Sequence, residues 1–293
     1  MSGATSVIER PKALPLVTWA YALVFALLLS WRLFDHLISD TPPSQSYHRF
    51  DAERLTALGK AVAQGAVGIV LLGDSRLRYA TWHDEPLAAA IAERLGRPVH
   101  LVRLVHDWGV FGDFAPLAPL LLDARPALVV IQDELFAKER ETPGRLLLGR
   151  TYLLWQLFGR GPWNPDGRDP ATYQDEQRCE VLAQIDAQAR KERVFLWVGF
   201  DPAGANARAA DAFADAVETV GGNVAVLSIP ITSEGSAILP GFERPADART
   251  LPAPPAIADN AFCDVVHMNE QGRDRFSRWL IDAVAARLAP EAS

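Results

Sequence analysis

Residues 67–79 read VGIVLLGDSRLRY, and this stretch decides how the fold of the whole chain is interpreted. The apolar run Val67–Leu72 has the length and composition of a strand that is buried on both faces. Gly73, Asp74 and Ser75 follow it directly, and small and polar residues of this kind form turns. A serine at a strand-to-helix turn exposes its hydroxyl, so Ser75 is a candidate nucleophile, although a simple helix cap would have the same sequence.

Strand-like and helix-like segments alternate on both sides of this stretch. Short apolar runs predict further buried parallel strands at Val99–Leu104, Leu128–Ile131, Val194–Val198 and Val224–Leu227. Helix-like segments precede, separate and follow the strands: 51–64, 86–95, 114–123, 176–191, 206–220 and 269–288. The alternation predicts an α/β fold with a doubly wound, parallel, five-stranded sheet and helices on both of its faces.

Two long segments, 137–175 and 228–262, interrupt the alternation. The first combines charges, Gly, Pro and several aromatic residues, and the second has repeated prolines and little periodicity. Loops of this length in a compact domain are usually functional or mobile. Ligands of open α/β sheets bind beyond the carboxyl ends of the strands, so we expect segment 228–262 to form a wall of a substrate cleft.

The N-terminal part of the chain has a different composition. Residues 13–31 read ALPLVTWAYALVFALLLSW, an uncharged run that is long enough for one membrane-spanning helix. A buried core helix and a cleavable signal peptide are the alternatives, but the run has no polar face and no small-x-small site directly after it. The Lys/Arg balance around it places the N-terminus in the cytoplasm. The sequence therefore predicts a cytoplasmic tail (1–12), a transmembrane anchor (13–34), a linker (35–50) and a main domain (51–293) in the periplasm, on the cell inner membrane.

Composition and charge argue against several classes of function. The chain of 293 residues has a net charge of −7 and no Lys/Arg-rich stretch, so nothing favours a nucleic-acid partner. The common nucleotide-binding and zinc-binding signatures are absent, and we expect neither a cofactor nor a metal. The two cysteines, Cys179 and Cys263, fit either one disulfide in an oxidising compartment or two unrelated thiols.

A second motif lies near the C-terminus, where residues 263–280 read CDVVHMNEQGRDRFSRWL. Asp264 and His267 are three positions apart, so one turn can hold both side chains together. Asp264 could then orient His267, which could accept the proton of the Ser75 hydroxyl. The alternative is a loop aspartate and a surface histidine ahead of a helix that a neighbouring polar residue caps.

Together, the Gly-Asp-Ser turn and the Asp-x-x-His pair resemble the first and last sequence blocks of the SGNH (GDSL-type) hydrolases, and the resemblance covers about residues 65–288. It implies a flavodoxin-like three-layer fold. It also implies that Ser75 is the nucleophile, that His267 is the base and that Asp264 orients the base.

The middle blocks of that family fit less well. The second block supplies a glycine N–H to the oxyanion hole, and in HDWGVFGDF this glycine would be Gly109 or Gly112. The third block, Gly-x-Asn-Asp, is absent, because the corresponding stretch reads LVVIQDELFAKE. Gln132 and Arg76 are possible substitutes for its asparagine. Either another donor replaces that asparagine, or the site is weak, or it is not catalytic.

A membrane-anchored domain of this kind is similar to the proteins that O-acetylate alginate and related exopolysaccharides, and to the D-alanyl-transfer protein of teichoic acids. The resemblance implies a serine-dependent acyltransferase or esterase with a polysaccharide substrate. It also implies a partner, either a multi-span membrane O-acyltransferase or a polysaccharide synthase complex. A non-catalytic envelope subunit and a simple GDSL lipase or esterase are the alternatives.

Overall fold

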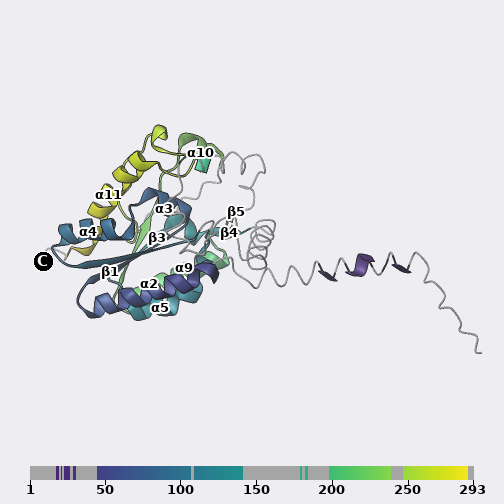
Figure 1. The fold of residues 1–293 in the computed structure, drawn as a ribbon, viewed down its shortest axis with the longest axis horizontal. Helices are drawn as coiled ribbons and strands as arrows, with labels where there is room; N and C mark the ends of the chain where they lie inside the picture. Colours follow the sequence, from purple (N-terminus) through teal and green to yellow (C-terminus); the bar gives the residue numbers. More distant parts are fainter. Residues whose placement is uncertain are drawn as a thin grey trace, which may run out of the picture.

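The computed structural model describes residues 45–106, 109–140, 198–238 and 247–289, together with residues 18, 19, 21, 23–26, 29, 30, 179, 182 and 183. Within these residues, the domain is an α/β fold with a central parallel sheet and helices on both of its faces (Figure 1).

The central sheet has four described strands in the order β2-β1-β3-β6. They are β1 (Val67–Gly73), β2 (Val99–Val105), β3 (Leu128–Gln132) and β6 (Asn223–Leu227), and every pair is parallel. The register aligns Gly73 with Val105, and Gln132 with Leu227. The carboxyl ends of the strands therefore lie along one edge of the sheet, which is the edge where open α/β sheets bind ligands.

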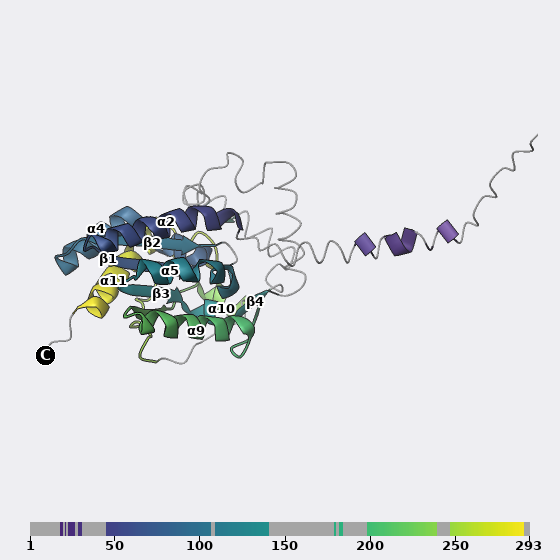
Figure 2. The same cartoon turned by 90° about the horizontal axis from the view of Figure 1, so that it is seen from below.

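Two hydrophobic clusters, one on each face of the sheet, form the core. Alternate side chains of a strand point to opposite faces, so Val70 and Leu72 of β1 belong to one cluster while Ile69 and Leu71 belong to the other. The first cluster lies under α2 (Gln45–Ala63), α5 (Ala118–Ala124) and α9 (Ala205–Thr219), which Figure 2 shows from outside. The second lies under α3 (Ser75–Ala80), α4 (Asp84–Leu95) and α11 (Glu270–Leu288).

A second, two-stranded sheet lies outside the central one. Strands β4 (Lys138–Arg140) and β5 (Val198–Phe200) pair antiparallel, with Lys138 opposite Phe200. Of the strand predicted at Val194–Val198, only Val198 is among the described residues, and it pairs with Arg140 of β4. The central sheet thus has four described strands, and a fifth parallel strand stays a prediction.

Several helix boundaries differ from those that the sequence predicts. Helix α2 begins at Gln45, inside the segment predicted as a linker. In the helix predicted at 114–123, residues Ala115–Leu117 form the 3-10 turn η2, which follows the turn η1 (Phe111–Asp113), and α5 begins only at Ala118. Pro119 lies in the first turn of α5, where its missing N–H costs no hydrogen bond. The proline-rich segment 228–262 contains two short described helices, α10 (Ser233–Ile238) and η5 (Asp259–Ala261).

The described part of the chain contains no helix that combines the length and the apolar composition needed to cross a membrane. Most of the apolar run at residues 13–31 lies outside the described residues, so the anchor stays a prediction. Most of segment 137–175 and of the helix predicted at 176–191 is outside them as well.

Candidate active site

Ser75 lies at the junction of β1 and α3. Strand β1 ends at Gly73, and Ser75 is the first residue of α3. The helix cap is Asp74, whose carboxylate accepts a hydrogen bond from the Arg76 N–H at 3.0 Å. Because Asp74 caps the helix, the Ser75 hydroxyl is free for another partner.

That partner is His267, which comes from the other end of the chain. Ser75 Oγ is 2.9 Å from His267 Nε2, and His267 Nδ1 is 2.6 Å from Asp264 Oδ2. A ring proton on Nδ1 satisfies both contacts, since Nδ1–H then donates to Asp264 and Nε2 accepts from the serine hydroxyl. The structure therefore joins Ser75, His267 and Asp264 in one hydrogen-bonded line.

The environment of Asp264 keeps it ionised. Its side chain is 2% exposed, and this burial alone would raise its pKa. The hydrogen bond and charge of His267 and the N–H groups of Val266 and His267 have the opposite effect, and the net pKa of Asp264 is below its usual value. An ionised Asp264 can stabilise a positive charge on His267.

Local contacts hold the loop that carries this pair. The Cys263 N–H donates to the His267 carbonyl at 2.7 Å, which closes the turn that Asp264 occupies. Asn269 then caps α11 by accepting from the N–H groups of Gln271 and Gly272. A disulfide joins Cys263 to Cys179, with Cα atoms 4.9 Å apart.

The two glycines considered for the oxyanion hole have other hydrogen-bond partners. The Gly109 N–H donates to the His106 carbonyl at 2.8 Å, and the Gly112 N–H donates to Asn206 Oδ1 at 2.9 Å. Neither N–H is available to a substrate in this conformation. An oxyanion role for either glycine thus stays a prediction that requires the loop to rearrange.

Gln132 and Arg76, the possible substitutes for the third-block asparagine, are buried beneath the Ser75 turn. Gln132 Oε1 accepts from the Asp74 N–H at 3.0 Å, and its side chain is fully buried. The Arg76 guanidinium forms ion pairs with Glu134 and, at 3.7 Å, with Asp74. Burial would lower the pKa of Arg76, but the charges of these carboxylates raise it, so Arg76 stays charged. In this conformation both residues support the turn.

Sequence reasoning missed Lys138 altogether. This buried lysine of β4 places Nζ 2.7 Å from Asp74 Oδ2. A single lysine between apolar and charged residues has no distinctive spacing, so no signal in the sequence marks it.

Asp133 follows β3 at the same edge of the sheet. Burial raises the pKa of its carboxyl to about 6, although a hydrogen bond from Ser228 and the charge of Arg76 oppose the shift. The Asp133 residue is only 8% exposed, so its carboxyl is buried at the end of β3. No group of three or more His, Cys, Asp or Glu side chains in the described residues is arranged to hold a metal ion.

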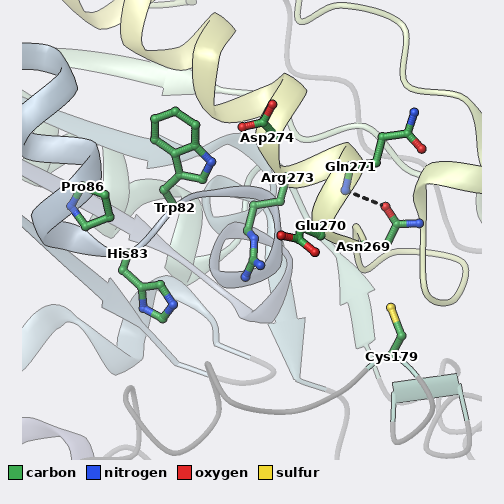
Figure 3. A pocket seen from close by; sticks show the side chains of 9 residues that line it. All are labelled: Trp82, His83, Pro86, Cys179, Asn269, Glu270, Gln271, Arg273 and Asp274. Carbon is green, nitrogen blue, oxygen red and sulfur yellow. Dashed lines mark hydrogen bonds between the residues drawn. The ribbon is translucent and has the colours of Figure 1, made fainter.

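A cavity of about 900 Å³ lies beside the start of α11. Figure 3 shows Trp82, His83 and Pro86 facing a set of polar α11 residues that includes Arg273. Asn269, which is two residues after His267 in the sequence, and Cys179 also line the cavity. Ser75 is not among the lining residues. The remaining lining residues are Glu270, Gln271 and Asp274.

Comparisons with known proteins assign no family to this chain. No protein-family model matches it, and neither does any curated protein. Among solved structures, the crystal structure of the lipase Lip_vut3 from goat rumen metagenome aligns with 76% of this chain and 100% of its own. The two are 11% identical, with a TM-score of 0.37, and at that score the likeness carries no argument.

Proposed function

We propose that this chain is a membrane-anchored, extracytoplasmic, serine-dependent acyltransferase or esterase that acts on an envelope polysaccharide or exopolysaccharide. The observation that carries the chemical part of the proposal is the hydrogen-bonded line of Ser75, His267 and Asp264. Its distances are within the reach that nucleophile, base and orienting acid require. The anchor and the polysaccharide come from the sequence.

In the proposed mechanism, Ser75 Oγ attacks the carbonyl carbon of an acyl donor while His267 Nε2 takes the hydroxyl proton. The positive charge on His267 is stabilised by Asp264. The tetrahedral intermediate collapses when the bond to the leaving group breaks and His267 protonates that group, which leaves an acyl ester on Ser75. A sugar hydroxyl or water then attacks the ester, with His267 again accepting and returning the proton. A sugar hydroxyl gives acyl transfer, and water gives hydrolysis.

The cavity beside α11 supports a polysaccharide as substrate. Its volume of about 900 Å³ is within the usual range of ligand-binding clefts. An aromatic ring such as Trp82 can contact the apolar face of a sugar, and Glu270 and Gln271 supply hydrogen-bonding groups for sugar hydroxyls.

A second candidate is a non-catalytic subunit of a polysaccharide synthesis or modification complex. The hydrogen bonds of Gly109 and Gly112 favour it, because they occupy both of the glycine N–H groups that are candidates for the oxyanion hole. Losing one such donor costs on the order of 10²–10³ in rate in other serine enzymes.

Labelling with a fluorophosphonate probe separates the two candidates. We expect the full-length protein to form a covalent adduct at Ser75, located by peptide mass spectrometry, and to hydrolyse p-nitrophenyl acetate. Ser75→Ala should abolish both, whereas the control Ser236→Ala, at an exposed serine of α10, should leave both unchanged. If sugar oligomers are added, acetyl transfer to them would indicate the transferase. A folded wild-type protein that is never labelled would favour the non-catalytic subunit.

A further inference from the structure

A buried ion pair lies directly beneath the Ser75 turn. Lys138 Nζ is 2.7 Å from Asp74 Oδ2, and the two side chains are only 7% and 6% exposed. Lysine and aspartate are almost never buried to this extent unless they are paired, because desolvating each charge costs several kcal/mol. Such a pair contributes little net stability. Its location next to Ser75 suggests a role in fixing the geometry of the turn.

The Asp74 residue is held from three directions. Its Oδ1 accepts from the Arg76 N–H at 3.0 Å, its Oδ2 accepts from Lys138, and its own N–H donates to Gln132 Oε1 at 3.0 Å. Because Ser75 is covalently joined to a residue with so many fixed contacts, its backbone can adopt few orientations. The direction of the Ser75 hydroxyl toward His267 thus depends on these contacts.

Lys138 is itself fixed by its strand and by Asn206. Strand β4 pairs with β5, and Asn206 Nδ2 donates to the Lys138 carbonyl and to Glu139 Oε2, both at 2.9 Å. Asn206 Oδ1 accepts from the Gly112 N–H. A continuous set of hydrogen bonds therefore runs from the Gly112 loop through Asn206 and Lys138 to the residue before Ser75.

The charges around Asp74 keep this arrangement ionised. Burial would raise the pKa of Asp74, but the charges of Lys138 and Arg76 and their hydrogen bonds outweigh it, and the net pKa is well below its usual value. Glu134 and Asp133 face Arg76 from the turn after β3. Asp74 hence remains ionised at neutral pH.

We propose that Lys138 is a positioning residue that acts through Asp74 to hold Ser75 within reach of His267. This inference rests on the proposed function, since the orientation of Ser75 matters for a reaction only if Ser75 reacts. Lys138 does not contact substrate in this scheme.

The test uses the full-length chain with Lys138→Met, the double variant Asp74→Asn/Lys138→Met, and Lys60→Met as a matched control at an exposed lysine of α2. Lys138→Met should lower both the Tm and the rate of fluorophosphonate labelling, the latter at least tenfold, because Asp74 is left buried without its partner. The double variant removes both charges, so its Tm should recover while its labelling stays slow. Lys60→Met should label at the wild-type rate.

Two results would overturn the inference: a Lys138→Met protein that labels at the wild-type rate, or a double variant whose labelling recovers together with its Tm. If wild-type Ser75 never labels, the proposed function fails, and the ring ¹⁵N shifts of His267 then test the positioning alone. A change at Nε2 in Lys138→Met, absent in Lys60→Met, would show that Lys138 sets the Ser75–His267 contact. Identical shifts would refute it.

Discussion

Two histidine–aspartate pairs in the described part of the chain have nearly the same geometry and different surroundings. His267 Nδ1 is 2.6 Å from Asp264, and its side chain is 16% exposed. His106 Nε2 is 2.7 Å from Asp51, and its side chain is 2% exposed. The first ring reaches the Ser75 hydroxyl and meets the edge of Tyr79, whereas the second stacks on Phe114.

The comparison shows that a histidine–aspartate hydrogen bond does not by itself indicate an active site. His106 follows β2, and its N–H donates to the Gly73 carbonyl at 3.1 Å, so this residue ties β2 to the end of β1. His267 lies in a loop that leaves one ring nitrogen beside a serine. Partial exposure and a hydroxyl partner make the His267–Asp264 pair a candidate for chemistry, whereas the His106–Asp51 pair is part of the core.

The largest loss of activity is expected for substitutions in the His267–Asp264 pair. His267→Ala should lower kcat for p-nitrophenyl acetate by about 10³-fold or more, and combining it with Ser75→Ala should cost little extra, because base and nucleophile act as a unit. Asp264→Asn should cost less than His267→Ala. Measured kcat values with matched circular dichroism spectra check this. A His267→Ala protein with wild-type kcat would show that the His267–Asp264 pair is not part of a reacting site.

His106→Ala should lower stability and leave kcat nearly unchanged. It removes the hydrogen-bond partner of the buried Asp51, which keeps an ion pair with Arg54 at 3.8 Å, and it removes a ring from the core, so the free energy of unfolding should fall by about 3–5 kcal/mol. The kcat of the folded fraction should stay within a few-fold of wild type. Urea unfolding and kinetics on the same samples measure both quantities. A variant that loses its kcat and keeps its stability would show that the buried pair belongs to the reacting site.

The smallest effect concerns pH and separates the behaviour of Asp133 from that of Asp264. The pKa of Asp133 is raised to about 6, so the folded chain retains a proton that the unfolded chain loses near pH 4. Stability from Asp133 is full below about pH 4 and is lost as pH rises through 6, by about 2–3 kcal/mol. The pKa of Asp264 is lowered, so its contribution is present above its ordinary pKa and is lost only as pH falls below it.

Asp133→Asn should therefore flatten the loss of stability between pH 4 and 6, whereas Asp264→Asn should leave that slope in place. Urea unfolding at several pH values across this window measures it. An unchanged slope in Asp133→Asn would contradict the burial argument.

Much of the α/β architecture could be predicted from local pattern. The runs at Val67–Leu72, Val99–Leu104, Leu128–Ile131 and Val224–Leu227 are parallel strands, because strands buried on both faces are continuous apolar segments. The strand predicted at Val194–Val198 has only its last residue in the described part, where it pairs antiparallel with β4. Local pattern does not specify which strand a short apolar run will pair with.

The sequence by itself determined which residues are candidates for chemistry: a serine at a strand end, and a histidine and an aspartate that one turn can hold together. Only the tertiary structure decided that Ser75 meets His267 across 192 positions, and that Lys138 lies beneath Asp74. It also decided that the N–H groups of Gly109 and Gly112 face other acceptors. The physical reason is that hydrogen bonds between distant segments depend on how loops and strands pack against each other. Such packing leaves no periodic pattern in the sequence.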